Sequence, residues 1–260
     1  MFQDLSWKLK EHSELIEYGY KHNLLYDICL REYRERAFKN WLEFPLKHAL
    51  AQGFKFSQNT PPGALREIFC ESIYDVRGFT PGRGQWVVDV GANYGDTAIW
   101  WAKTFGSKVF AFEPLVDVYN ELNENVKLNG VDVITYNVAL GNGKEIKGNS
   151  SGNMFSIGGS TKIKTIKLDD YLFERLNLLK IDVEGFEYEV LQGAKKTISR
   201  YRPKIIIETH SKNLRKVCHE FLSSLGYFLQ VEGRTVVSNN PGMDRITNLF
   251  YRNLNSIDTA

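Results

Sequence analysis

Residues 86–97 read WVVDVGANYGDT, and this stretch decides the fold that we expect for the chain. Its first five residues are apolar except for Asp89, which indicates a buried β-strand over 86–90. Gly91 and Gly95 then turn the chain directly into a segment with a helical pattern. In a doubly wound sheet, a strand, a glycine turn and a helix in this order form the place that binds a nucleotide-like ligand.

The same alternation of short apolar runs and longer amphipathic segments continues toward the C-terminus and predicts an α/β fold. We expect strands at 86–90, 108–113, 133–140, 178–183, 204–208, 227–231 and 247–251, and helices around 96–105, 117–129, 186–199 and 212–225. Gly106, Gly130 and Gly226 follow three of these helices, where a left-handed residue commonly ends a helix. Nearly continuous apolar strands are typical of sheets covered on both faces, so we expect a doubly wound, mostly parallel sheet.

Residues 1–66 are expected to form a helical N-terminal extension, and residues 67–260 the sheet domain. Apolar residues recur at helical spacing in the extension, as at Phe38, Trp41 and Leu42. Pro45 stands where a new helix could begin, because proline is favoured in a first helical turn. Such an extension could cover a pocket, pair subunits into a homo-oligomer or bind an acceptor, and the sequence leaves these roles open.

The segment 141–165 interrupts the strand and helix alternation, because it is rich in Gly, Ser and Lys. We expect a loop or a ragged hairpin there. It would act either as a flap over a site or as a plain surface excursion.

The composition limits the partners and the compartment. The chain carries 33 Lys and Arg against 31 Asp and Glu, a net charge of +2, so nothing demands a nucleic-acid or anionic-membrane partner. The three cysteines lack metal-binding spacing and suit a reducing interior. The N-terminus does not resemble a secretion signal, and no apolar run reaches the roughly 20 residues that cross a bilayer. We therefore expect a cytoplasmic protein without a membrane span.

The glycine turn lacks the spacing of a phosphate-binding loop. A dinucleotide fingerprint would need glycine at 93 and 96, where Asn93 and Asp96 stand, and a GxxxxGK[ST] loop is also absent. Glu113 ends the second strand, 24 positions after Asp89, where an acid can accept hydrogen bonds from both hydroxyls of a ribose. These features indicate a nucleoside with a cationic tail, so we expect S-adenosylmethionine as the cofactor. In the plainer alternative, the glycines only turn the chain and Glu113 is solvated.

Five motifs follow one another along the chain. They are DVGANYG at 89–95, FEP at 112–114, TIKLDD at 165–170, KIDVEGFE at 180–187 and IETH at 207–210. Together they resemble the FkbM family of S-adenosylmethionine-dependent methyltransferases, over roughly residues 68–230. The resemblance implies a seven-stranded Rossmann-like sheet whose last strand is antiparallel. It also implies O-methylation of a hydroxyl group on a small molecule, a glycan or a natural product.

The same resemblance implies roles for single residues of the cofactor pocket. The methionine side would be shaped by Asp89, Gly91, Ala92, Asn93 and Gly95, and the following helix would begin with Tyr94 and Thr97. Glu113, with Pro114 behind it, would hold the ribose. Asn137 and Val138 would flank the adenine ring, unless Asn137 only ends a strand.

Four ionisable residues follow two later strands. Asp182 and Glu184 come after the fourth strand, and Glu208 and His210 stand at the end of the fifth. Residues two apart in an extended segment point the same way, and unpaired carboxylates there would lose hydration without gaining packing. We therefore expect a functional cluster. Our hypothesis is that Asp182 orients the cofactor amine or the acceptor, while His210, partnered by Glu208, accepts the proton of the acceptor. A solvated His210 is the plainer alternative.

Other interpretations stay open beside this one. Glu187 and Glu189, on the next helix, are expected to be surface or capping charges. Our preferred interpretation has no metal, but Asp182, Glu208 and His210 could instead bind a divalent cation that lowers the pKa of the acceptor. A nucleic-acid substrate is disfavoured, since DVEG stands where amino-directed enzymes tend to carry [DN]PP[YF]. A non-catalytic module that binds S-adenosylmethionine is the alternative from another class.

Overall fold

The computed structural model describes residues 37–151, 154–157, 159–240 and 243–254, and the chain divides into two compact units. One unit runs through Phe54 and adds Pro61–Ser72, and the other comprises Lys55–Thr60 and the chain from Ile73 onward. The helical prediction for residues before 37 lies outside the described residues. The proposed domain boundary between residues 66 and 67 stays a prediction.

The first unit is helical where it is described. It contains α3 (Ala37–Ala51), the 3-10 turn η1 (Pro62–Leu65) and α4 (Arg66–Phe69). The rings of Phe54 and Phe69 pack against each other, with centroids 4.8 Å apart. The prediction that a helix begins at Pro45 is wrong, because α3 already runs from Ala37 and passes through this residue. A proline inside a helix removes one backbone hydrogen bond, but the buried ring of Pro45 adds to the packing of the unit.

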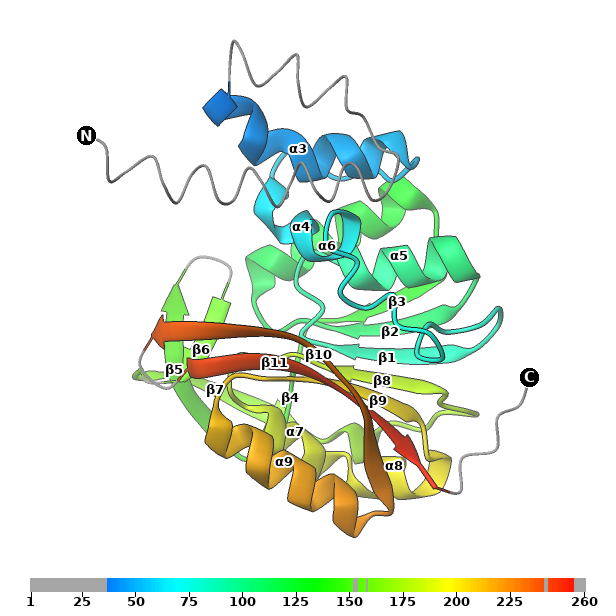
Figure 1. The fold of residues 1–260 in the computed structure, drawn as a ribbon, viewed down its shortest axis with the longest axis vertical. Helices are drawn as coiled ribbons and strands as arrows, with labels where there is room; N and C mark the ends of the chain where they lie inside the picture. The colour runs from blue at the N-terminus through cyan, green and yellow to red at the C-terminus, as the bar shows by residue number, and fades with distance from the viewer. Residues whose placement is uncertain (1–36, 152–153, 158, 241–242, 255–260) are drawn as a thin grey trace. The chain divides into compact units, whose positions relative to one another are not determined.

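The second unit is built on a seven-stranded sheet, with the strand order β10-β11-β9-β8-β1-β2-β3 (Figure 1). The strands are β1 (Trp86–Val90), β2 (Lys108–Phe112), β3 (Val133–Tyr136), β8 (Leu178–Ile181), β9 (Lys204–Thr209), β10 (Tyr227–Asn240) and β11 (Met243–Asn253). The pairs among β3, β2, β1, β8 and β9 are parallel, whereas β11 is antiparallel to both β9 and β10. The expected doubly wound, mostly parallel sheet with an antiparallel last strand is thus confirmed.

Helices cover both faces of this sheet. Helices α5 (Asp96–Phe105) and α6 (Val116–Asn129) lie on one face, and α7 (Glu187–Gly193), α8 (Lys195–Tyr201) and α9 (Lys212–Ser224) on the other (Figure 1). Gly106, Gly130 and Gly226 all have positive φ, as predicted for residues that end helices. The single helix predicted over 186–199 is divided at Ala194 into α7 and α8.

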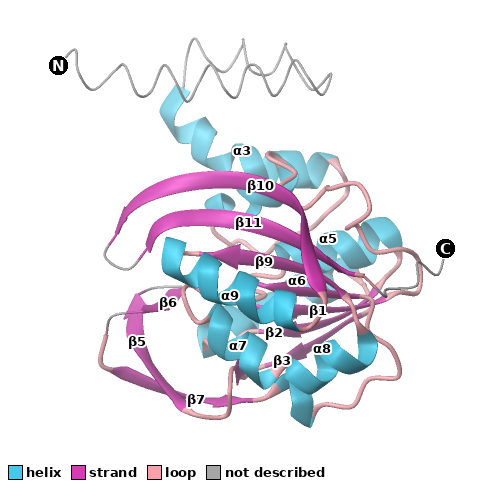
Figure 2. Ribbon diagram, turned by 60° about the horizontal axis from the view of Figure 1, so that its bottom comes forward, coloured by secondary structure: helices cyan, strands magenta, loops and turns pink. Residues whose placement is uncertain are grey.

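A second, smaller sheet follows the third strand, in the order β4-β7-β5-β6. It comprises β4 (Ala139–Leu140), β5 (Glu145–Ser151), β6 (Met154–Ile157) and β7 (Thr161–Ile166), and the last three are labelled in Figure 2. The 3-10 turn η2 (Leu168–Asp170) follows β7 in the chain. One prediction is corrected here. The strand expected over 133–140 ends at Tyr136 and resumes in the other sheet as β4. Of the two alternatives for residues 141–165, the structure agrees with the hairpin rather than the loop, because β5 pairs antiparallel with both β6 and β7.

The central strands of the main sheet are buried on both faces. Val87 and Val88 of β1, and Ile205 to Ile207 of β9, are completely buried, so side chains on both faces of these strands are shielded from water. Because neighbouring strands are parallel, their carboxyl ends meet at one edge, which is where such folds bind ligands.

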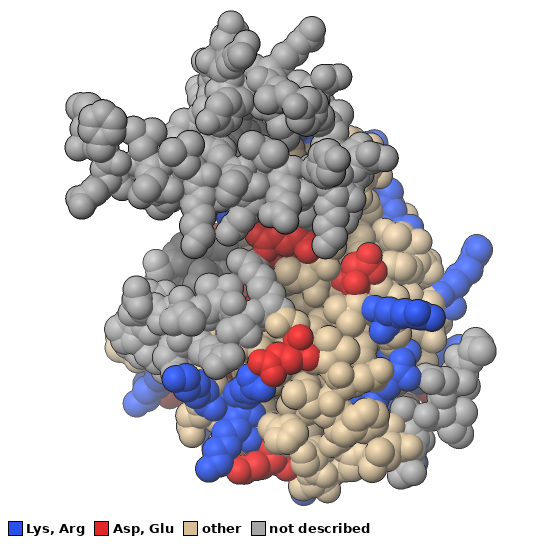
Figure 3. Space-filling view, in the orientation of Figure 1, with Lys and Arg blue, Asp and Glu red and all other residues tan. Residues whose placement is uncertain are grey.

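The surface carries mixed charge. Over the face shown in Figure 3, Lys and Arg side chains of the described residues lie among Asp and Glu side chains, in line with the net charge of +2. Each helix in the described part of the chain is too short or too polar to cross a bilayer.

Candidate active site

One pocket lies at the carboxyl edge of the main sheet and collects residues from both sheets. It is bordered by the turn after β1, the end of β2, the segment after β8, and strands of the smaller sheet. Its lining residues are Val90, Gly91, Asn93, Phe112, Glu113, Pro114, Leu115, Val138, Ala139, Leu140, Ile146, Ile163, Asp182, Val183, Glu184 and Phe186. The pocket is therefore apolar along β4, β5 and β7 and acidic along the ends of β2 and β8.

The glycine turn after β1 is tight because of its neighbours. Gly91 has φ +77°, and a Cβ added there would lie 1.8 Å from the backbone oxygen of Asp182. The N–H groups of Gly91 and Ala92 both donate to the carbonyl oxygen of Phe112. Only glycine permits this close approach, so the turn draws the ends of β1 and β8 together at the pocket.

Gly95 closes the turn and begins α5. It has φ +86°, and a Cβ added there would lie 2.4 Å from Cδ1 of Leu122. Asn93, with φ +49°, is also left-handed, and its Oδ1 is buried without a hydrogen-bond partner among the described residues. The turn thus keeps one unsatisfied acceptor at the pocket.

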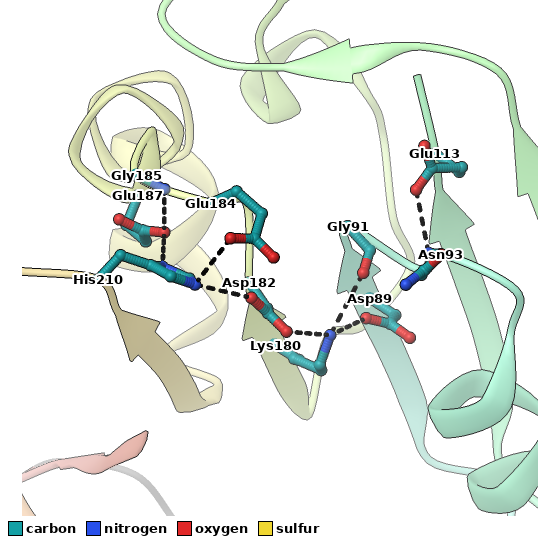
Figure 4. Close-up of polar contacts among 10 residues, drawn as sticks. All are labelled: Asp89, Gly91, Asn93, Glu113, Lys180, Asp182, Glu184, Gly185, Glu187 and His210. Atoms are coloured by element: carbon teal, nitrogen blue, oxygen red, sulfur yellow. Dashed lines mark hydrogen bonds and ion pairs between the residues drawn. The ribbon is translucent and has the colours of Figure 1, made fainter. Parts of the chain in front are cut away.

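Glu113 is a buried acid held by two backbone groups (Figure 4). Its Oε2 accepts a hydrogen bond from the N–H of Asn93 at 3.0 Å, and its Oε1 accepts one from the N–H of Leu115 at 2.9 Å. Burial raises the pKa of Glu113 to about 7, although both N–H groups act in the opposite direction. The Nδ2 of Asn137 donates to the carbonyl oxygens of Glu113 and Pro114 and so holds the backbone at these two residues in place.

The residues predicted to bind the cofactor divide into two groups. Gly91, Asn93, Glu113, Pro114, Val138 and Asp182 line the pocket. Asp89, Ala92, Tyr94, Gly95, Thr97 and Asn137 are not among the described residues that line it. Asp89 lies fully buried beneath the pocket, and Thr97 is buried in α5. Tyr94 is held by its carbonyl oxygen, which accepts a hydrogen bond from Nδ2 of Asn125.

Lys180 lies between the carboxylates of Asp89 and Asp182 (Figure 4). Its Nζ lies 3.0 Å from Oδ1 of Asp89, 3.4 Å from the carbonyl oxygen of Gly91 and 3.7 Å from Oδ2 of Asp182. Burial alone lowers the pKa of Lys180, but the carboxylates of Asp89 and Asp182 outweigh it and raise this pKa above its usual range. A permanently charged ammonium therefore balances both carboxylates. Sequence reasoning did not identify this residue, since a lysine inside a strand is usually exposed.

His210 is surrounded by three carboxylates (Figure 4). Its Nδ1 donates to Oε1 of Glu187 at 2.8 Å, and its Nε2 lies 3.3 Å from Oε2 of Glu184 and 3.8 Å from Oδ1 of Asp182. Burial lowers the pKa of His210, but Glu187, Asp182 and Glu184 together raise it to about 10. As predicted from their spacing, Asp182 and Glu184 both line the pocket, whereas His210 is buried behind them.

Of the two interpretations of Glu187, the surface charge is wrong, whereas a contact with a backbone N–H at the start of α7 agrees with the capping charge. This side chain is completely buried, and its Oε1 accepts from the N–H of Gly185 as well as from His210. Sequence alone could not show this, because an acid in a first helical turn is most often exposed. Glu189 is half-buried in α7. Glu208 is buried in β9 opposite Asn248 of β11, and His210 contacts the carboxylates of Glu187, Asp182 and Glu184.

Two further groups were not singled out from the sequence. Ile146 of β5 and Ile163 of β7 line the pocket, so the segment 141–165 contributes an apolar wall to it. The cluster around His210 also differs in one member from the metal ligands considered from the sequence, which were Asp182, Glu208 and His210. Among the described residues, Asp182, Glu184 and His210 each offer one ligand atom, all within 4.8 Å of one another.

Comparison with known proteins places these features in a family. The family model of the methyltransferase FkbM domain matches residues 89–231. Methyltransferase 1 of Beauveria bassiana is 27% identical over 205 residues, which cover 64% of this chain and 81% of that protein. Hexuronic acid methyltransferase AglP of Haloferax volcanii is 32% identical over 135 residues, which cover 47% of this chain and 55% of that protein. The solved structure of methyltransferase FkbM from Methylobacillus flagellatus has a similar fold, with a TM-score of 0.50 at 18% identity over 80% of this chain and 58% of that one.

Proposed function

The chain belongs to the FkbM family of methyltransferases, and from this premise we propose that it transfers a methyl group from S-adenosylmethionine to a hydroxyl oxygen. The observation that carries the proposal is one pocket lined by both Glu113 and Asp182, with a glycine turn between them. Acids on both sides suit a ligand that has ribose hydroxyls at one end and a cationic amino acid at the other. They do not suit a pyrophosphate, which needs donors and positive charge.

The pocket residues fit the cofactor group by group. Glu113 would accept hydrogen bonds from the ribose hydroxyls, since each carboxylate oxygen has a second lone pair beyond its backbone contact. The buried, unsatisfied Oδ1 of Asn93 and the carboxylate of Asp182 would accept from the amino group of the methionine part. Val138, at the other end of the pocket, would pack against the adenine ring. When bound, S-adenosylmethionine supplies an electrophilic methyl group on a positively charged sulfur.

The chain's own task is then to position an acceptor. In the proposed reaction, the bond from the acceptor oxygen to the methyl carbon would form as the bond from sulfur to carbon breaks, and the proton of the hydroxyl would pass to solvent. Holding the acceptor in line can contribute about 7 to 11 kcal/mol in favourable cases. Ile146 and Ile163 would help to exclude water from the pocket, because both are apolar side chains that line it.

The raised pKa supports a positioning role for His210 in place of the base role proposed from the sequence. With a pKa of about 10, the imidazole keeps its proton at neutral pH and does not accept another one. In the absence of a bound metal ion, the resulting imidazolium would balance and orient the carboxylates of Asp182 and Glu184, with Glu187 rather than Glu208 as its hydrogen-bond partner.

The acceptor is proposed to be a small molecule, a glycan or a natural product. One relative is named as a hexuronic acid methyltransferase, which supports sugars as the first acceptors to test. The test is mass spectrometry of a panel of hexuronic acids, glycans and phenols incubated with the protein and deuterium-labelled S-adenosylmethionine. We expect the label on an acceptor oxygen, and Asp182→Asn to abolish it while Glu124→Gln, an exposed change on α6, preserves it. Ligand binding without transfer to any acceptor would favour the non-catalytic module, and label on nitrogen would contradict the O-directed assignment.

A further inference from the structure

We propose that Asp182, Glu184 and His210 form a binding site for one first-row divalent metal ion, which holds the acceptor oxygen at the pocket. The three side chains come from two segments of the chain, the turn after β8 and the end of β9. They differ from the cation site considered from the sequence, because Glu184 takes the place of Glu208.

The distances between the ligand atoms suit a single ion. Nε2 of His210 lies 3.3 Å from Oε2 of Glu184 and 3.8 Å from Oδ1 of Asp182, and all three atoms lie within 4.8 Å of one another. Bonds of about 2.0 to 2.2 Å at tetrahedral or octahedral angles separate neighbouring ligand atoms by about 3.0 to 3.5 Å. The separation of Nε2 of His210 from Oε2 of Glu184 already lies in this range, and rotation of the Asp182 side chain would bring its oxygen onto the same ion.

A separate observation concerns the orientation of the imidazole. Nδ1 of His210 donates to Glu187, a completely buried carboxylate that is itself held by the N–H of Gly185. This contact assigns a proton to Nδ1 and directs Nε2 at Glu184 and Asp182, and a metal ion bound at Nε2 would displace the proton from that nitrogen. Histidines that bind metals nearly always donate their other N–H to such a partner. The other oxygen of this carboxylate, Oε2, is buried and has no hydrogen-bond partner among the described residues.

The carboxylate of Asp182 is oriented in a comparable way. Its Oδ2 faces the buried ammonium of Lys180 at 3.7 Å, whereas its Oδ1 faces His210. One oxygen is thus occupied by a fixed cation, and the other is directed toward the proposed ion. The carboxylate of Asp182 is therefore held in one orientation by its neighbours.

The site is closed on one side and open on the other. His210 is 2% exposed, while Asp182 and Glu184 line the pocket. An ion bound by all three would keep its remaining positions toward the pocket, as catalytic metal sites do. One imidazole and two carboxylates suit Mn²⁺, Fe²⁺ or Zn²⁺ better than Ca²⁺ or Mg²⁺, which prefer oxygen ligands alone.

The catalytic part of this inference rests on the proposed function. A hydroxyl group bound to the ion would have a lower pKa, so its O–H bond would break and the proton would pass to solvent before the oxygen attacks the methyl carbon. The binding part does not depend on methyl transfer, and it is measured without any methyl donor or acceptor.

The experiment is a titration of the protein with Mn²⁺, in which electron paramagnetic resonance reports the free ion. We expect one Mn²⁺ to bind per chain, Glu184→Ala to weaken binding at least tenfold, and Glu187→Gln to weaken it by about 10- to 100-fold. Glu189→Gln, which changes a carboxylate of the same helix outside the cluster, is expected to bind as the wild type does. If Glu187→Gln does not fold, Glu184→Ala decides alone, because this side chain is 30% exposed.

Several results would overturn the proposal. If the wild-type protein leaves all Mn²⁺ free, there is no site, and if Glu184→Ala binds Mn²⁺ unchanged, the ligands are wrongly assigned. Full methyl transfer after exhaustive chelation would remove the ion from catalysis. Loss of transfer on chelation with recovery on adding Mn²⁺ would support that role. A protein that binds Mn²⁺ at Glu184 but methylates nothing would contradict the proposed function and leave the metal site standing.

Discussion

Replacing Glu113 by glutamine isolates the acid that we assign to the ribose. The substitution keeps the size of the side chain but removes its charge, and it removes one of the two oxygens that accept from the N–H groups of Asn93 and Leu115. A hydrogen bond to a charged group contributes about 1.5 to 3 kcal/mol, so we expect S-adenosylhomocysteine to bind about 10- to 150-fold more weakly.

The pKa of Glu113 adds a second signature. Burial raises this pKa to about 7, and the ionised form is the one that accepts hydrogen bonds from two hydroxyls. Binding should therefore strengthen as the pH rises through 7. At pH 6 about one carboxyl in ten is ionised, so we expect affinity to fall about tenfold between pH 8 and pH 6. The glutamine variant has no such group, and its affinity should stay level over this range.

Isothermal titration calorimetry with S-adenosylhomocysteine measures both effects. Glu124→Gln serves as the matched control, because Glu124 is exposed on α6 and its loss should leave binding unchanged. A melting curve without ligand accompanies each variant, since an N–H group left without an acceptor also costs stability. Affinity of Glu113→Gln within twofold of the wild type, or a pH dependence that persists in it, would refute the assignment.

Three further substitutions test the structure around the pocket. Lys180→Met should lower the free energy of unfolding by about 3 to 5 kcal/mol, because Asp89 would become an unpaired buried charge. Chemical denaturation measures this loss. A loss below about 1 kcal/mol, which is what we expect for the exposed control Lys127→Met, would contradict the prediction. Gly91→Ala should lower the free energy of unfolding by at least about 2 kcal/mol and abolish binding of S-adenosylhomocysteine, since its Cβ would meet a backbone oxygen at 1.8 Å. A well-folded variant with wild-type affinity would disprove the close approach. Ile206→Ala should lower the free energy of unfolding by about 2 to 5 kcal/mol, since Ile206 is completely buried in β9. Thermal or urea unfolding measures this loss, and a change within about 0.5 kcal/mol would contradict the assigned core.

The main sheet could be predicted because local sequence determines it. Apolar runs such as KIIIE at 204–208 become strands covered on both faces, and glycines such as Gly106 and Gly130 end helices at their expected places. These signals come from propensity and periodicity, which are readable within about ten residues.

The smaller sheet could not be predicted in the same way. Its strands contain Gly, Ser and Lys, so they lack the apolar alternation that indicates a half-buried strand. Backbone pairing between β5 and its two neighbours holds them together, and pairing leaves little trace in one sequence. The apolar wall of Ile146 and Ile163 was missed for this reason.

The candidate site was predicted in part. The spacing of Asp182 and Glu184 indicated that both face the pocket, but the partner of His210 did not follow from spacing. Glu187 meets His210 because the first turn of α7 lies beside the end of β9, which is a tertiary contact. Lys180 was not singled out because burial of a lysine depends on the acids around it, and these come from two separate segments.

A crystal structure with S-adenosylhomocysteine tests the central claim most directly. The account predicts the ligand in the pocket between the two acids, with its ribose hydroxyls at the Glu113 carboxylate and its amino group near Asn93 and Asp182. Density for the ligand elsewhere, or a ribose without contact to Glu113, would contradict it.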